Sequence, residues 1–144
     1  MIRPALTLTL WLALSALIVV NNVIGDTWIA ERLSVMAVQW YKVLVPLPYV
    51  ALLAAIHARR TAGPRWLDAA LMAALLWPPS TVFADFLYEH LTFGEEPASF
   101  LERFAFWWGA PYPLLVIALF AAPLVAGRVL AFRSSLPSGE RNVN

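Results

Sequence analysis

A small group of ionisable residues within apolar runs offers the first candidates for chemistry. Lys42 lies in the run 33–56, and Asp85 and Glu89 lie at the end of the run 67–87 and just beyond it. Asp85 and Glu89 are the candidate partners of Lys42, because they are four residues apart and share one face of a helix. A Lys42–Asp85 ion pair would link the two runs. Ionisable groups at membrane depth are costly and usually face a partner or a water-filled cavity, although a lysine can also extend to the interface. These residues therefore indicate a structural ion pair or a transport site.

A metal site is a second interpretation of the same residues. Asp85, Glu89 and His90 carry side chains of the types that bind zinc, manganese or iron. A di-metal site in a helical bundle would need a Glu-x-x-His motif repeated on another helix, and the other histidine, His57, is expected on the opposite side of the membrane. A solvated acidic loop is the simpler interpretation, and we expect no cofactor.

Other polar residues are expected near the same depth as Lys42. The predicted binding vestibule consists of Asn21, Gln39, Lys42, Ser80, Thr81 and Asp85. Pro78 and Pro79 directly precede two of these residues and remove backbone donors, so they should break or kink the third run. Interrupted helices present backbone groups to substrates in transporters, but they also occur as purely structural kinks.

The elements that must position these residues are membrane helices. The chain has 144 residues and is 61% hydrophobic and 13% charged, whereas soluble domains are roughly half apolar and about 25% charged. A helix needs about 20 apolar residues to cross a bilayer, and such runs occur at about 5–24, 33–56, 67–87 and 104–125. The sequence predicts an all-α polytopic membrane protein with four transmembrane helices in one bundle. Residues 1–133 would form this domain, and 134–144 would form a flexible cytoplasmic tail.

Local signals suggest where some helices begin. Asp26 or Thr27 could cap the second helix, and Ser99 with Glu102 fits a capping box that would start the fourth helix near Phe100. The first run is too long for a signal-peptide core, which is usually about 7 to 15 residues. We therefore expect it to remain as a span.

The distribution of arginine predicts the orientation, because short cytoplasmic loops are enriched in basic residues. With both termini in the cytoplasm, the outer side would hold Arg32 and Arg103, and the cytoplasmic side would hold Arg3, Arg59, Arg60, Arg65, Arg128, Arg133 and Arg141. The expected location is the cell inner membrane.

Small residues predict how the helices pack. Alanines four apart recur in the second, third and fourth runs, all in the predicted cytoplasmic half, and such residues allow backbones to approach closely. The predicted outer half is rich in aromatic residues and proline. We expect a bundle that is closed at its cytoplasmic end and opens outward, unless the aromatic residues are simply an interfacial belt.

The sequence supports no specific enzymatic reaction. It contains no cysteine, no Gly-rich phosphate loop, no Gly-x-Ser-x-Gly and no His-Glu-x-x-His, and its net charge of +1 does not suggest nucleic-acid binding. The first hypothesis is a non-enzymatic accessory or helix-packing component of a membrane assembly, in contact with lipid and with other subunits or copies of itself. It is motivated by the small-residue faces and by the lack of a dense polar constellation in the sequence. The alternatives are a small transporter or channel with a polar site in the outer half, and a membrane-embedded enzyme acting on a lipid or quinone.

Overall fold

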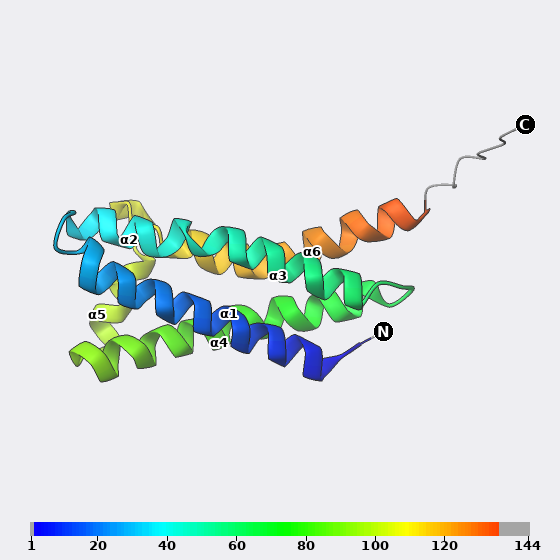
Figure 1. The fold of residues 1–144 in the computed structure, drawn as a ribbon, viewed down its shortest axis with the longest axis horizontal. Coiled ribbons are helices and arrows are strands. Elements are labelled where there is room, and N and C mark those ends of the chain that lie inside the picture. Colours follow the sequence, from blue (N-terminus) through cyan, green and yellow to red (C-terminus); the bar gives the residue numbers. More distant parts are fainter. Residues whose placement is uncertain (1, 136–144) are drawn as a thin grey trace, which may run out of the picture.

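A computed structural model describes residues 2–135. It is 85% helical, and the described range contains no β-strand. Four helical segments are long and apolar enough to cross a membrane, and they comprise Pro4–Ile29, Val35–Arg60, Trp66–Phe93 and Tyr112–Ser135. These segments run side by side along the long axis of the molecule (Figure 1). The predicted all-α class with four such helices is confirmed, and the architecture fits a small integral membrane protein.

The first two spans have internal junctions. Helix α1 (Pro4–Ile24) continues as the π-helix η1 (Gly25–Ile29), and the second span consists of α2 (Val35–Leu44) and α3 (Pro46–Arg60). The junction between α2 and α3 keeps helical dihedral angles at Val45, with φ −66° and ψ −40°. Pro46 stands at the first position of α3, where a missing N–H costs least.

The expected cap of the second helix was wrong. Thr27 continues the first span, because its hydroxyl donates to the Val23 carbonyl at 2.7 Å. Ser34 caps α2 instead, and its Oγ accepts from the Ala37 N–H at 3.2 Å. The helix of the second span therefore begins two residues after the start of the apolar run.

Helix α4 (Trp66–Phe93) runs unbroken through Pro78 and Pro79, so the expected break is absent. The prolines remove donors for the carbonyls of Ala74 and Leu75, but the surrounding bundle holds the helix in place. Trp77 is fully buried, and its Nε1–H donates to the Thr7 carbonyl of α1 at 3.2 Å. Tertiary contacts of this kind compensate for the backbone bonds lost at proline.

The fourth span begins later than predicted. The short helix α5 (Pro97–Leu101) is followed by the 3₁₀ turns η2 (Glu102–Phe104) and η3 (Phe106–Trp108), and only then by α6 (Tyr112–Ser135). The capping box at Ser99 and Glu102 thus does not start the long helix. Gly109, at φ +85°, ends the turns in a conformation that favours glycine. Pro111 directly precedes α6 and Pro113 is its second residue, and at a helix start the missing N–H groups of proline cost little.

The structure describes only the first two residues of the expected tail. Helix α6 continues through Ser134 and Ser135. Residues 136–144 lie outside the described range.

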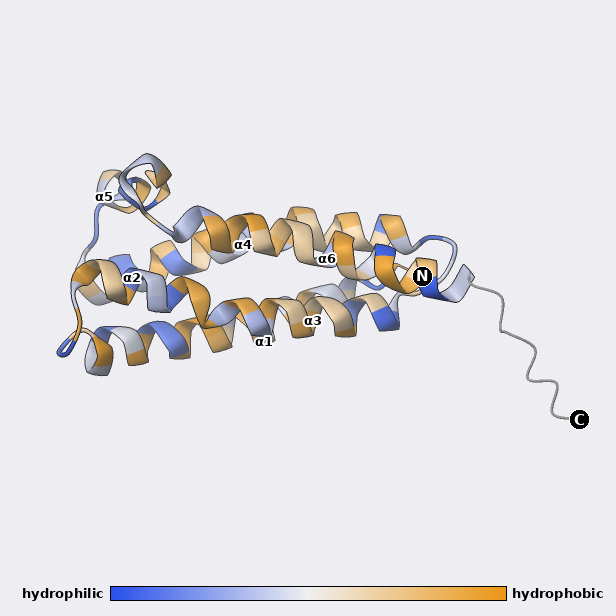
Figure 2. Ribbon diagram, turned by 90° about the horizontal axis from the view of Figure 1, so that it is seen from above, coloured by the Kyte–Doolittle hydropathy of each residue, from blue (hydrophilic) through white to orange (hydrophobic). Residues whose placement is uncertain are grey.

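The bundle has two distinct ends. One end, on the right of Figure 1, holds the start of α1, the α3–α4 connection and the last turns of α6, and is called the amino-terminal end. The other end holds the connection from η1 to α2 and residues 94–111, and is called the far end. Figure 2 shows apolar residues along most of the helix lengths and strongly hydrophilic ones mainly towards these ends.

Small residues are used inside the bundle. Helix α6 packs mainly against α3 and α4, and the buried alanines of those helices are Ala54, Ala58, Ala69, Ala70, Ala73 and Ala74. Gly127 of α6 is packed so closely that an added Cβ would lie 2.7 Å from a ring carbon of Trp66. The amino-terminal half is therefore tightly packed, and its buried alanines are turned towards other helices of the same chain, whereas Ala51 is exposed.

Candidate functional site

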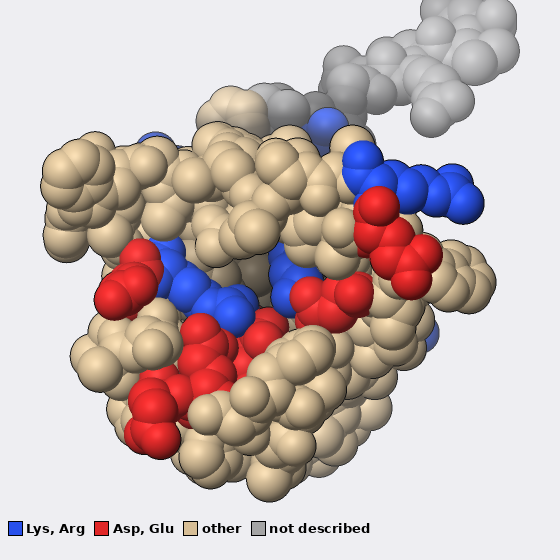
Figure 3. All heavy atoms as spheres, turned by 90° about the vertical axis from the view of Figure 1, so that its left-hand side faces the viewer, with Lys and Arg blue, Asp and Glu red and all other residues tan. Residues whose placement is uncertain are grey.

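Polar and charged side chains converge at the far end from every span. We call this set the polar cluster; its members are Asn22, Asp26, Gln39, Lys42, Asp85, Tyr88, Glu89, Glu95, Arg103 and Tyr112. Figure 3 looks onto this end and shows acidic and basic side chains around a hollow in an otherwise largely uncharged surface. Buried polar groups are costly unless they are paired, so their convergence identifies the candidate site.

Lys42 lies at the centre of an ion-pair network. Its Nζ pairs with Asp26 at the end of the first span and with Glu89 Oε1 at 3.2 Å. Arg103 Nη1 contacts the same Glu89 oxygen at 3.1 Å, and its Nη2 contacts Glu95 Oε2 at 3.0 Å. Because the Lys42 side chain is 12% exposed and that of Glu89 is 5% exposed, these are mostly desolvated pairs. The network joins the first three spans to the η2 turn.

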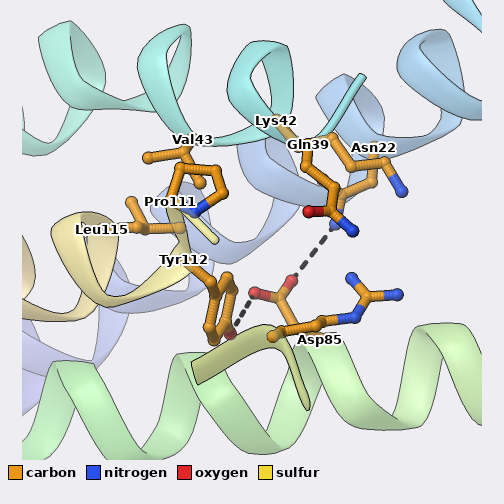
Figure 4. A pocket seen from close by; sticks show the side chains of 9 residues that line it. Asn22, Gln39, Lys42, Val43, Asp85, Pro111, Tyr112 and Leu115 are labelled. Carbon is orange, nitrogen blue, oxygen red and sulfur yellow. Dashed lines mark hydrogen bonds between the residues drawn. The ribbon is translucent and has the colours of Figure 1, made fainter. Parts of the chain in front are cut away.

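Asp85 lies one helical turn deeper than Glu89 and has neutral partners. Asn22 Nδ2 donates to Asp85 Oδ1 at 3.2 Å, and the Tyr112 hydroxyl donates to Oδ2 at 2.7 Å (Figure 4). The Asp85 residue is 4% exposed and forms no ion pair within the described part of the chain.

The predicted Lys42–Asp85 ion pair was therefore wrong, and Lys42 pairs with Glu89, the other candidate partner on the third span. Helix α2 begins at Val35, which places Lys42 nearer the far end than an entry at Leu33 would. The ammonium group consequently reaches Glu89 and Asp26 instead of Asp85. The prediction that Asp85 and Glu89 share a helix face was right, since both are buried on the interior side of α4.

A small cavity adjoins Asp85. Its lining includes Asn22, Gln39, Lys42, Asp85, Arg103 and Tyr112, with Val43, Pro111 and Leu115 as the apolar wall. The space available to the centre of a water-sized sphere is about 20 Å³, which is enough for about one water molecule. A wider groove at the surface is also lined by Gln39 and Arg103. The site can therefore hold water beside a buried carboxyl, but not a large ligand.

The remaining residues of the predicted vestibule lie outside this cavity. Asn21 is buried, but its neighbour Asn22 supplies the amide that lines the cavity. Ser80 is half-buried, and Thr81 is 1% exposed and lies one turn from Asp85. Of the predicted binding set, the structure brings Gln39, Lys42 and Asp85 together.

Several members of the polar cluster were not predicted as site residues. Asn22 and Asp26 are four residues apart at the end of the first span, a spacing that could have suggested a common face. Tyr112 stands between two prolines, which could have identified the true start of the fourth helix. Sequence periodicity gave no signal for Arg103, because it acts from an irregular segment.

The three candidate metal ligands have other partners in the described structure. His90 is exposed, its Nδ1 lies 2.9 Å from the Glu95 carbonyl oxygen, and its ring stacks on Phe86. Glu89 already contacts two cations, and Asp85 is held by neutral groups. Among residues 2–135, no group of three or more His, Asp or Glu side chains is arranged to hold a metal ion.

Arg103 is the cation of the network that comes from the irregular segment 94–111. Burial favours its neutral form, but the charges of Glu89 and Glu95 outweigh this effect and raise the pKa of the guanidinium. A cation with a raised folded-state pKa stabilises the protein at every pH below its unfolded pKa, which for arginine is above about 12. The contribution of Arg103 should therefore be constant across the physiological range.

Replacing Arg103 by lysine should loosen the segment 97–110. The guanidinium uses separate nitrogens for Glu89 and Glu95, whereas one ammonium is a single compact charge. Loss of one of these contacts should speed amide hydrogen exchange in this segment by about tenfold, which corresponds to about 1.4 kcal/mol. Hydrogen-exchange mass spectrometry of the protein in detergent would measure this exchange rate. The matched control is Arg65→Lys, at an exposed ion pair with Asp68; equal exchange in both variants would contradict the assigned role.

Comparisons with known proteins give no relative. No protein-family model matches this chain, and neither a curated protein nor a solved structure is significantly similar to it.

Proposed function

We propose that this chain is a small proton-translocating membrane protein, a channel or transporter, in which Asp85 binds the proton. The observation that carries the proposal is a carboxyl group within a membrane-spanning helix, 4% exposed, whose hydrogen-bond partners are the neutral side chains of Asn22 and Tyr112. An ionised carboxylate at such a place is costly, whereas a neutral carboxyl is tolerated. A group of this kind is suited to exchanging a proton.

The cavity supports a proton as the translocated species. Its space of about 20 Å³ admits about one water molecule and excludes larger solutes. A lipid or quinone would not fit beside Asp85, which weighs against the enzymatic alternative. The wider groove at Gln39 and Arg103 offers water a way towards the cavity from the far end.

The charges around the site also favour a cation over an anion. The ion-pair network contains three carboxylates, Asp26, Glu89 and Glu95, and two cations, Lys42 and Arg103. The carboxylates outnumber the cations, so the network carries a net negative charge. Focused negative charge attracts cations towards a cleft.

Two observations weigh against the accessory role. It rested on small-residue faces available to a partner and on the lack of a dense polar constellation. The buried alanines contact other helices of this chain, and the polar cluster is such a constellation. Transport is therefore the better supported of the two hypotheses.

We further propose that the protein lies in the inner membrane with both termini in the cytoplasm, so that the far end faces outward. The support is the arginine distribution along the sequence. A fluorescent protein that matures only in the cytoplasm should be bright when fused after Asn144. A dark fusion, together with an active fusion of a phosphatase that works only outside the cytoplasm, would reverse the orientation.

Proton flux into liposomes tests the function. Purified protein would be reconstituted with an internal pH-sensitive dye, and a potassium gradient with valinomycin would impose a negative-inside potential. Vesicles with wild-type protein should acidify faster than protein-free vesicles prepared in the same way. Equal rates at a confirmed protein density would overturn the proposal.

A further inference from the structure

Buried side chains follow one face of α4 from the polar cluster towards the amino-terminal end. Glu89, Asp85, Thr81 and Trp77 are spaced four residues apart and are at most 4% exposed. Residues at this spacing lie one above another on a helix face. The line therefore leads inward from Asp85, away from the water at the far end.

A buried histidine lies at the other end of this line. His57 of α3 is 1% exposed, its Nε2 lies 2.9 Å from the Thr7 hydroxyl, and its ring meets the Trp77 ring edge-on at 5.8 Å. A second small cavity borders His57, lined also by Thr61 and Trp66 at the amino-terminal end. Neutral and protonated imidazole interconvert readily near neutral pH, so a buried histidine can serve as a proton acceptor.

Two unpartnered hydroxyl groups occupy intermediate positions along α4 and α1. Thr81 stands between Asp85 and Trp77 in α4, and Ser15 stands between Thr7 and Asn22 in α1, the residues that contact His57 and Asp85. Thr81 Oγ1 and Ser15 Oγ are buried and have no hydrogen-bond partner in the described structure. They belong to α4 and α1, which contact each other. A buried polar atom without a hydrogen-bond partner reduces stability by about 1–3 kcal/mol. In protein interiors an ordered water molecule usually supplies the missing hydrogen bond. These hydroxyls therefore point to a ligand the size of water in the middle of the bundle.

We infer that His57 is a second proton site, joined to Asp85 by hydrogen-bonded water at Thr81 and Ser15. This inference rests on the proposed function and deepens it by giving the proton a path. The Asp85 carboxyl gives its proton to a neighbouring water or hydroxyl oxygen, which passes its own proton onward, and an imidazole nitrogen of His57 accepts the last one. The imidazolium then releases a proton to water at the amino-terminal end. The Asp85 carboxylate takes up a replacement proton from water at the far end, so that every group along the path regains its starting protons after one cycle, and no electrons are transferred.

Thr81→Val tests the path with little risk to the fold. Valine has nearly the same shape as threonine, and the lost hydroxyl has no hydrogen bond to break. Thermal stability should stay the same or rise, whereas proton flux should fall by at least about tenfold. Thr9→Val is the matched control, since Thr9 is an exposed threonine on α1 and its loss should leave flux unchanged. Wild-type flux in Thr81→Val would overturn the path, because a purely structural role would give that result.

His57→Gln tests the second site. Glutamine can still hydrogen-bond to Thr7 but cannot carry the proton, so flux should again fall by at least about tenfold in protein that remains folded by size-exclusion chromatography. If Asp85→Asn stops flux while Thr81→Val and His57→Gln conduct normally, the path is wrong and the proposed function stands. If wild-type protein conducts no protons, both are wrong.

Discussion

Replacement of Asp85 by asparagine is expected to abolish protein-dependent proton flux. The amide matches the carboxyl in shape, and its oxygen can still accept from the Tyr112 hydroxyl, which lies 2.7 Å from Asp85 in the wild type. It cannot take up and release a proton in the physiological range. Flux should therefore fall to the level of protein-free vesicles in the dye assay, a loss of about a hundredfold or more for a group through which every proton passes.

Two controls separate this effect from a loss of structure. Asp68→Asn removes an exposed carboxyl that pairs with Arg65 at the amino-terminal end, and it should conduct like the wild type. Thermal unfolding of Asp85→Asn should occur near the wild-type temperature, because the gain from replacing a buried group that is costly to ionise offsets the loss of the hydrogen bond from the Asn22 amide. Substantial flux through a folded Asp85→Asn protein would rule out Asp85 as the proton carrier.

The membrane-helix architecture could be predicted because it depends on composition and run length. The four apolar runs correspond to the four long helices. The residues at which helices begin and end were less predictable, because nearby capping residues and prolines favour different helix starts. The capping box at Ser99 had less influence than the prolines at 111 and 113, which moved the start of the last long helix to Tyr112.

The site was only partly predictable, because its pairing depends on differences in depth of about one helical turn, roughly 5.4 Å. Lys42 and the shared face of Asp85 and Glu89 were visible in the sequence. The choice between the two carboxylates depended on where α2 begins. Arg103 and Tyr112 reach the site through the irregular segment 94–111 and its end, and periodicity does not indicate where such a segment folds.

Lys42→Met should cause the largest loss of stability among single substitutions in the polar cluster. The substitution leaves Asp26 without a cation and Glu89 with Arg103 alone. Removing one partner of a buried ion pair typically costs about 3–5 kcal/mol. The lower value, about 3 kcal/mol, applies here because the Lys42 and Asp26 side chains are 12% and 16% exposed and Tyr88 still donates to Asp26 at 3.0 Å.

The thermal midpoint in mild detergent would measure this loss, with Arg65→Met as the control for removing an exposed cation. That control breaks a pair whose side chains are 70% and 48% exposed, so it should change stability by less than about 1 kcal/mol. Equal midpoints for the two variants would show that Lys42 is not part of a desolvated network.

A double substitution distinguishes the loss of the attraction that Lys42 provides from the cost of leaving the Asp26 carboxylate without a cation. In Lys42→Met with Asp26→Asn, the carboxylate that lost its cation is also neutralised, and the new amide oxygen can still accept from the Tyr88 hydroxyl that Asp26 contacts in the wild type. If the cost of Lys42→Met comes mainly from a desolvated, uncompensated carboxylate, the double variant should recover about half of the lost stability or more. If the effects of the two substitutions simply add, the cost comes from Glu89 and the packing of the lysine stem instead. The stability of the far end would then depend on the contact between the second and third spans, with Asp26 a peripheral member of the network.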